Sequence, residues 1–501
     1  MGEGAIGSPA PASPRGAPAQ AELPARTRQG LAFLGAALVL GLLADALLQL
    51  VPDRLNLVLG LDALVLVVVA LTHTGFMGLP ARLGTLAAPI LLLGLALLWH
   101  DSPVLFALNL AGVASVAVLA APRLRSLGTR LGTADYALGA VDLAGASAMG
   151  APALLLTDID WAAMPDGNAR RLRGLSLGLA VSVPVAFVFA GLLMQADAAF
   201  DTLLSRALDV EWFVEHGARV GLVAWLAAGL LRGLAGSVSP SAIASRRAGS
   251  LGLGEIGPVL ATVDLLFLLF VAVQFRYLFG GGELVRTLTG LSYAEYARRG
   301  FFELVAVAAL TLPLLLVADH FLDRSDGRRV RRFRQLAGLM LILLDVMLAS
   351  ALLRMWLYTT QFGLTELRFY TTAFMAWLVL VLGWFAATVL RGRRERFAAG
   401  ALVGGWLVLA AINLVNPDRV IAEVNLSRAA RGRPLDVAYA ATLSADALAT
   451  YRRRLPQLGT NEACETAQRL NDRWNRELHT NKRWTIALAQ APRGQIGCGL
   501  P

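Results

Sequence analysis

Hydrophobic residues occur in long runs separated by short polar connections. Most runs hold about 20 residues, the length at which an α-helix crosses the hydrocarbon core of a bilayer. We predict eleven crossings from these runs: 31–51, 55–72, 83–99, 103–121, 174–195, 218–235, 256–278, 301–318, 336–356, 370–390 and 398–415. The expected fold class is therefore all-α, a polytopic membrane helix bundle that occupies residues 31–415.

The two ends of the chain differ from this pattern. Residues 1–30 are rich in Ala, Pro, Gly and Ser, a composition that buries too little apolar surface to fold, so we expect a disordered tail. Residues 416–501 mix polar residues with apolar ones at helical spacing. We expect a small soluble helical region there, with Ser444 and Thr460 as N-caps.

The segment 137–156 is rich in Ala and Gly and carries Asp142, so hydropathy alone leaves it undecided. Basic residues decide, because Arg and Lys stay on the cytoplasmic side. With the N-terminus inside and eleven crossings, the inner segments hold 23 basic residues, the outer loops 9 and the C-terminal tail 13. A twelfth crossing would move the arginines of 328–334 outside. We therefore predict a re-entrant or surface-lying helix for 137–156.

This topology places the N-terminus on the cytoplasmic side of the membrane and the C-terminus outside. Both cysteines, Cys464 and Cys498, follow the last apolar run and would face an oxidising compartment. We expect a disulfide between them; two free thiols are the alternative.

Composition excludes a water-soluble globule, because 56% of the residues are hydrophobic, 16% are charged and the mean hydropathy is +0.60. The net charge of +10 would suggest nucleic acid as a partner of a soluble protein. Here the arginines lie in short connections between apolar runs, as membrane topology requires. We expect membrane lipid and an envelope protein bound at the C-terminal tail as partners, and no nucleic acid.

No motif indicates a cofactor, a metal site or catalytic residues. Gly252, Gly254 and Gly257 match a GxGxxG pattern, but no strand precedes them and a membrane helix follows. The five histidines form no HExxH pair, and the chain contains no GxSxG elbow.

Ionisable residues within apolar spans cost about 2.5 kcal/mol or more at the bilayer centre, so they usually face the bundle interior. Asp45 and Asp62 share one hairpin, where we expect each to bind a nearby hydroxyl or amide. A larger polar cluster is predicted in the second half, with the members Asp264, Gln274, Arg276, Glu303, Asp345 and Arg354.

Glu303 and Arg354 lie at similar predicted depth and have opposite charges, so we predict a buried pair between them. Asp345 precedes Arg354 by nine residues, which places the two on opposite helix faces. The cluster could serve as a proton or substrate relay; the alternative is that it only fixes helix register. The loop 276–300 combines tyrosines with arginines and is typical of a helix in the headgroup layer.

Several segments resemble an uncharacterised family of bacterial multi-pass membrane proteins, a domain of unknown function. They are VDLLFLLFVAVQFRYLFGG (263–281), TGLSYAEYARRGFFELVAVAAL (289–310), LLRMWLYTTQFGLTELRFY (352–370), NLVNPDRVIAEVNLSRA (413–429) and LDVAYAATLSADAL (435–448). The resemblance covers about residues 170–450. It implies a location in the bacterial cytoplasmic (inner) membrane, and it implies no substrate or reaction.

Three functional hypotheses follow. The first is a non-enzymatic envelope scaffold, sensor or assembly partner that docks through its C-terminal tail. The second is a transporter or lipid flippase that uses the intramembrane polar cluster. The third is an enzyme acting on a lipid-linked substrate, which would favour a long outer loop after the first crossing. That loop consists of little more than residues 52–54.

Overall fold

A computed structural model describes residues 24–51, 53–77, 83–125, 133–161, 210–235, 253–279, 301–322, 324–480, 484–491 and 494–498. The regular elements among these residues are helices, and no β-strand occurs among them. The membrane-length helices are α1 (Ala25–Leu50), α2 (Asp53–His73), α3 (Leu83–Trp99), α4 (Pro103–Arg125), α5 (Thr133–Ala153), α8 (Val210–Leu234), α9 (Leu253–Phe279), α12 (Phe301–Phe321), α13 (Gly327–Phe362), α14 (Glu366–Thr388) and α15 (Phe397–Val415).

The all-helical fold class is confirmed. Ten of the predicted crossings fall on these helices, whereas the crossing at 174–195 lies outside the described residues. In the described part of the chain, seven helical stretches of at least 18 residues are apolar enough to span a bilayer, and one of them is Gly139–Asp158. The number of crossings stays a prediction.

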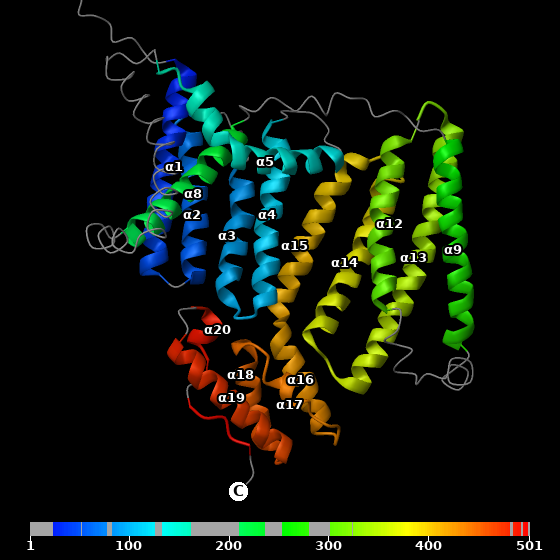
Figure 1. Ribbon diagram of the computed structural model, residues 1–501. Coiled ribbons are helices and arrows are strands. Elements are labelled where there is room, and N and C mark those ends of the chain that lie inside the picture. The colour runs from blue at the N-terminus through cyan, green and yellow to red at the C-terminus, as the bar shows by residue number, and fades with distance from the viewer. Residues whose placement is uncertain are drawn as a thin grey trace, which may run out of the picture.

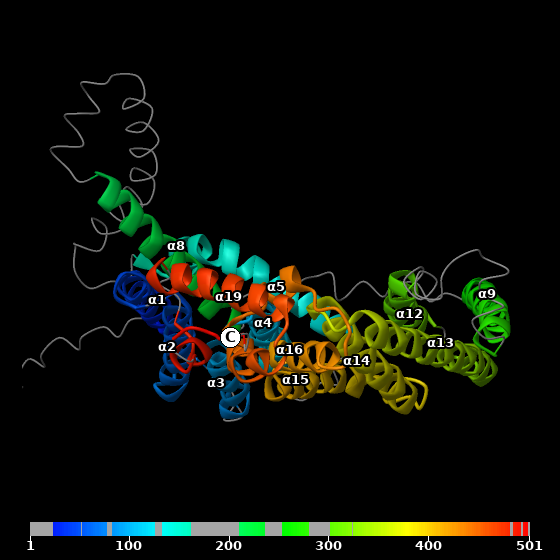
Figure 2. The same cartoon turned by 90° about the horizontal axis from the view of Figure 1, so that it is seen from below.

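The bundle is an extended row of helices (Figures 1 and 2). Neighbouring helices pack in the order α1, α2, α3, α4, α15, α14, α13, α9, so the two halves of the chain meet where α4 contacts α15. Helices α5, α8 and α12 lie along one face of this row (Figure 2). Large apolar side chains such as Leu66, Leu222 and Trp356 are exposed on the row, which is what a lipid-facing surface requires.

Helix α5, which contains most of the undecided segment 137–156, lies crosswise to α4 and α15 near the ends that face away from the C-terminus (Figure 1). It crosses α8 at very short range: a Cβ atom on Gly150 would lie 2.8 Å from the Cα atom of Gly229. The small residues that weakened the hydropathy signal therefore permit a close helix crossing.

The C-terminal residues form a separate helical module with its own hydrophobic core, which includes Ile421, Tyr451, Leu470 and Trp474. We use "the module" for residues 416–498. Its elements are α16 (Pro417–Ala429), α17 (Val437–Ala440), the short 3₁₀ turn η4 (Ala445–Ala447), α18 (Leu448–Arg454), α19 (Asn461–Thr480) and α20 (Ile486–Ala489). In Figure 1 it lies below the lower ends of α3, α4 and α15.

Local chemistry sets the entry into the module and closes its far end. Asn416 takes a left-handed conformation with φ of 57°, ends α15 and caps α16 by accepting from the backbone N–H of Arg419. Thr460 caps α19 through Ala463 N–H, as predicted. Ser444 does not cap η4, because its hydroxyl binds two carboxylates instead. Cys464 and Cys498 are joined by a disulfide.

Candidate functional site

The predicted intramembrane cluster is only partly visible, because the side chains of Gln274, Arg276 and Glu303 lie outside the described residues. Asp264 on α9 is 4% exposed, and neither of its carboxylate oxygens has a hydrogen-bond partner among the described residues. On α13, Asp345 is exposed whereas Arg354 is buried, so they occupy different faces of the helix. Within the described part of the chain, no ion pair joins Asp264 or Asp345 to Arg354.

Asp45 has an amide partner, as expected, and a second partner that was not expected. Its carboxylate lies 2.8 Å from Nδ1 of His216 on α8, and it also accepts a hydrogen bond from Gln49. The expectation of a hydroxyl or amide partner was therefore incomplete, because α8 packs against α1 and brings in an imidazole from far along the sequence.

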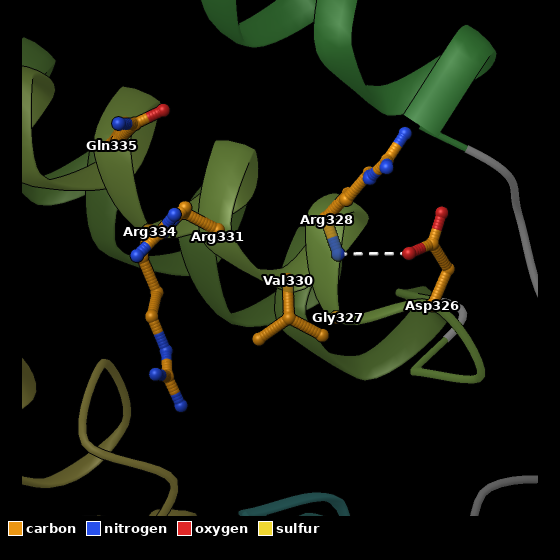
Figure 3. Close-up of a pocket in the computed structure, with 7 residues that line it drawn as sticks. All are labelled: Asp326, Gly327, Arg328, Val330, Arg331, Arg334 and Gln335. Atoms are coloured by element: carbon orange, nitrogen blue, oxygen red, sulfur yellow. Dashed lines mark hydrogen bonds between the residues drawn. The ribbon is translucent and has the colours of Figure 1, made fainter.

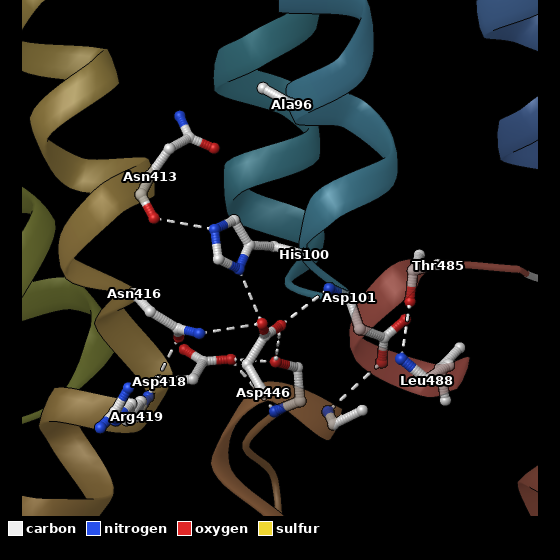
Figure 4. Close-up of polar contacts among 12 residues, drawn as sticks. Ala96, His100, Asp101, Asn413, Asn416, Asp418, Arg419, Asp446, Thr485 and Leu488 are labelled. Atoms are coloured by element: carbon white, nitrogen blue, oxygen red, sulfur yellow. Dashed lines mark hydrogen bonds and ion pairs between the residues drawn. The ribbon is translucent and has the colours of Figure 1, made fainter. Parts of the chain in front are cut away.

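The most extensive polar site lies where the module meets the bundle (Figure 4). One side of it is the three-residue turn 100–102 between α3 and α4. Arg54, at the start of α2, is 6% exposed and donates to the carbonyl oxygens of His100 at 2.6 Å and Asp101 at 3.0 Å. Its guanidinium also lies 4.8 Å from the ring centroid of Phe106. A buried cation therefore fixes the backbone of this turn.

Asp446 in η4 is the acceptor at the centre of the junction (Figure 4). Two donors come from the bundle: Nδ1 of His100 at 2.7 Å and the backbone N–H of Asp101 at 2.7 Å. Two more come from the module: the Asn416 amide at 3.1 Å and the Ser444 hydroxyl at 3.0 Å. Burial raises the pKa of Asp446, but the hydrogen bond and charge of His100 outweigh it together with the other donors, so that the pKa falls below its ordinary value.

His100 is held on both sides of its ring. Its second nitrogen, Nε2, lies 2.8 Å from the carbonyl oxygen of Asn413 on α15, and its side chain is 3% exposed. A backbone carbonyl only accepts, and an ionised Asp446 also only accepts, so both hydrogen bonds require a proton on each ring nitrogen. The geometry therefore describes a buried imidazolium–carboxylate pair between the bundle and the module.

A second buried carboxylate, Asp418, lies beside this pair and differs from it electrostatically. It is 0% exposed and accepts from the backbone N–H of Ser444 at 3.1 Å and from the Ser444 hydroxyl. Burial raises the pKa of Asp418; the Ser444 hydrogen bonds oppose this rise and the charge of Asp446 adds to it. The single proton of the Ser444 hydroxyl is therefore shared between the two carboxylates, and the pKa values of the two aspartates shift in opposite directions.

The module also contacts the turn between α13 and α14, in the other half of the row. Asn425 on α16 accepts from the backbone N–H of Leu364 and donates to its carbonyl oxygen, both at 2.8 Å. Arg428 donates to the carbonyl oxygen of Gln361, and the Glu366 backbone N–H donates to the Tyr439 hydroxyl at 2.6 Å. The module is therefore bound to turns from both halves of the bundle.

The junction does not form a nucleophilic site. Ser444 contacts Asp418 and Asp446, whereas both nitrogens of His100 are engaged elsewhere, so no Ser–His hydrogen bond exists to activate the hydroxyl. Within the described residues, no group of three or more His, Cys, Asp or Glu side chains is placed to hold a metal ion. What the arrangement does is hold two parts of the chain together.

A protein-family model matches most of the chain. The model, described as Domain of unknown function (DUF4153), matches residues 87–453, well over half of the chain. The chain belongs to this family. No curated protein matches it, and neither does any solved structure.

The DUF4153 match begins within α3, earlier than the resemblance at 170–450, and it ends within α18. It therefore includes both sides of the junction, from His100 to Asp446. The α1–α2 hairpin and the disulfide lie outside it. The domain accordingly comprises most of the bundle together with the first part of the module.

Sequence reasoning missed this site because its partners lie about 345 residues apart along the chain. Two local signals were present. The turn 100–102 reads His-Asp-Ser between two apolar runs, and the segment 413–418 reads Asn-Leu-Val-Asn-Pro-Asp at the end of the last one.

Proposed function

We propose that this DUF4153 protein is a non-enzymatic membrane scaffold or sensor whose C-terminal module is the docking element for an envelope partner. The observation that carries the proposal is the buried attachment of the module to both halves of the bundle. His100 and Asp446 form one attachment, and Asn425 with Leu364 forms the other. A partner protein or a ligand bound to the module would therefore alter the packing of the helices in both halves of the row.

The expected sidedness supports this role. The module lies at one end of the bundle. The arginine-rich segments 324–334, which include the start of α13, and 391–396 lie at the opposite end (Figure 1). Since arginines stay on the cytoplasmic side, the module would face outward, where its disulfide is stable.

Cysteine labelling tests this orientation of the module. After reduction of intact cells, a membrane-impermeant maleimide should modify Cys464 and Cys498, and protection until the cells are lysed would refute the outward assignment.

A transporter or lipid flippase is the second candidate, and Asp264 is the observation that favours it. A carboxyl group that is 4% exposed in a membrane helix, with no hydrogen-bond partner among the described residues, is a typical proton-coupling or substrate-contacting group.

Complementation of a deletion strain at native expression separates the two functions. If the protein is a scaffold, Asp264→Asn should restore growth under envelope stress, whereas a chain ending after Val415 should fail although its bundle is inserted. If it is a transporter, Asp264→Asn should fail at wild-type abundance and wild-type thermal stability. The exposed replacement Asp472→Asn is the control in either case, because it removes one carboxylate from the surface of α19.

A further inference from the structure

The end of the bundle that faces away from the module contains an open pocket of about 900 Å³ at the start of α13 (Figure 3). Its basic lining residues are Arg328, Arg331 and Arg334, and its acidic lining residue is Asp326. We propose that this pocket binds the phosphate of an anionic phospholipid headgroup. The proposal is independent of the role assigned to the module.

The charges in the pocket are unbalanced. Asp326 is the N-cap of α13: it accepts from the backbone N–H of Arg328 at 2.8 Å and lies 3.9 Å from Nε of Arg329. None of the guanidinium groups of Arg328, Arg331 and Arg334 has a carboxylate or hydrogen-bond partner among the described residues. Like charges three residues apart on a helix destabilise it, and an anion between them removes that penalty.

The guanidinium of Arg334 extends from the pocket toward a neighbouring turn. A Cβ atom on Gly392 would lie 3.6 Å from Nη2 of Arg334, so this group reaches the α14–α15 turn. The same turn carries four further exposed arginines: Arg391, Arg393, Arg394 and Arg396. The positive potential therefore extends from α13 across to α14 and α15, and it suits a phosphate more than a neutral headgroup.

The depth of the pocket favours a lipid over a soluble anion. The apolar part of α13 begins directly after Gln335, and Phe333 is already buried in the core of the bundle. Trp384 on α14 is partly exposed and donates from its indole to the carbonyl oxygens of Arg396 and Phe397, as an interfacial tryptophan does. The guanidinium groups thus lie just beyond the apolar layer, at the level of lipid phosphates.

Native mass spectrometry of the full chain in detergent tests the proposal, with phosphatidylglycerol and phosphatidylcholine of identical acyl chains as probes. The pocket variant is Arg331→Gln/Arg334→Gln. The matched control is Arg332→Gln/Arg394→Gln, which removes two charges from the same end of the bundle at residues that do not line the pocket. All four positions are at least partly exposed, so both variants should keep the wild-type unfolding temperature.

We expect the wild type to prefer phosphatidylglycerol, and the pocket variant to bind it about tenfold more weakly. The control should change by less than about twofold, since a diffuse charge effect would weaken both variants equally. Equal loss in both variants, or no preference between the two lipids, would overturn the proposal. Displacement of phosphatidylglycerol by an equal concentration of inorganic phosphate would also overturn it, because the site would then be one for a free anion.

Discussion

Replacing Asp446 by Asn should release the module from the bundle. Asp446 accepts four hydrogen bonds, from His100, Asp101, Asn416 and Ser444. An asparagine has one carbonyl oxygen and one NH₂ group at the same positions. In either orientation, the NH₂ group therefore faces two donors, and the imidazolium loses its counter-charge.

The expected loss of docking free energy follows from these contacts. A hydrogen bond to a charged group contributes about 1.5–3 kcal/mol, and removal of one member of a buried ion pair costs about 3–5 kcal/mol. Because asparagine keeps the shape and one acceptor, we expect a loss of about 2–3 kcal/mol in module docking. Since 1.4 kcal/mol is a factor of ten, the undocked state should become roughly 30- to 150-fold more populated.

Hydrogen exchange of the full chain, followed by mass spectrometry, measures this population. The informative peptides are those that contain the backbone amides of Asp101, Ser444 and Ala445, each of which donates across or beside the junction. Asp472→Asn, an exposed change on α19 with the same loss of charge, is the control. If exchange in Asp446→Asn matches the control within about a factor of two, then Asp446 does not hold the module.

The same contacts set the pH dependence. The folded-state pKa of Asp446 lies below its ordinary value of 3.8, so its contribution to stability is present above that pH and is lost as the pH falls through the folded-state pKa. The pKa of Asp418 is raised, so its contribution has the opposite sign: stability from this group falls as the pH rises from 3.8 toward its folded-state value. Protection factors should fall at acid pH in the wild type, and this fall should be smaller in Asp446→Asn, where only other carboxylates such as Glu423, whose pKa is lowered by its hydrogen bond from Arg454, still lose their contribution.

Three further outcomes are expected. Asp418→Asn should change the free energy of module docking at neutral pH, measured by hydrogen exchange, by less than about 1 kcal/mol. The replacement removes a buried carboxylate, while the remaining side-chain oxygen still accepts from Ser444. A loss as large as that of Asp446→Asn would contradict the assigned direction of the Asp418 pKa. Cys464→Ser should loosen the end of the module by about 3–4 kcal/mol, the chain-entropy value for a 34-residue separation, and reduction of the wild type should reproduce the effect in exchange of α19. Asn109 and Asn413 exchange side-chain hydrogen bonds at 3.0 and 2.9 Å between α4 and α15, so Asn413→Leu alone should cost about 1–3 kcal/mol by thermal unfolding. The double replacement with Asn109→Leu should recover most of that loss, and simple additivity would argue against the pairing.

The sequence determined the helical class and the positions of the membrane-length helices. A span of about 20 apolar residues must satisfy its backbone hydrogen bonds internally, so each run specifies a helix whatever its neighbours are. The end of α15 is also determined by the local sequence. Pro417 disfavours a helical conformation at the residue before it, and the left-handed Asn416 occupies that position. The interpretation of 137–156 as a re-entrant or surface-lying helix stays a prediction, since Gly139–Asp158 is also long and apolar enough to span a bilayer.

Only the tertiary structure decided which polar groups meet. His100 and Asp446 are 346 residues apart, and Asp45 meets an imidazole 171 residues away on α8. Apolar periodicity indicates that a helix is buried, but it does not indicate which helix lies beside it, since lipid and protein interiors are similarly apolar. The pairing of α4 with α15 brings the two halves of the chain together in the middle of the row. That pairing places the polar turn 100–102 and the end of α15 in one buried junction.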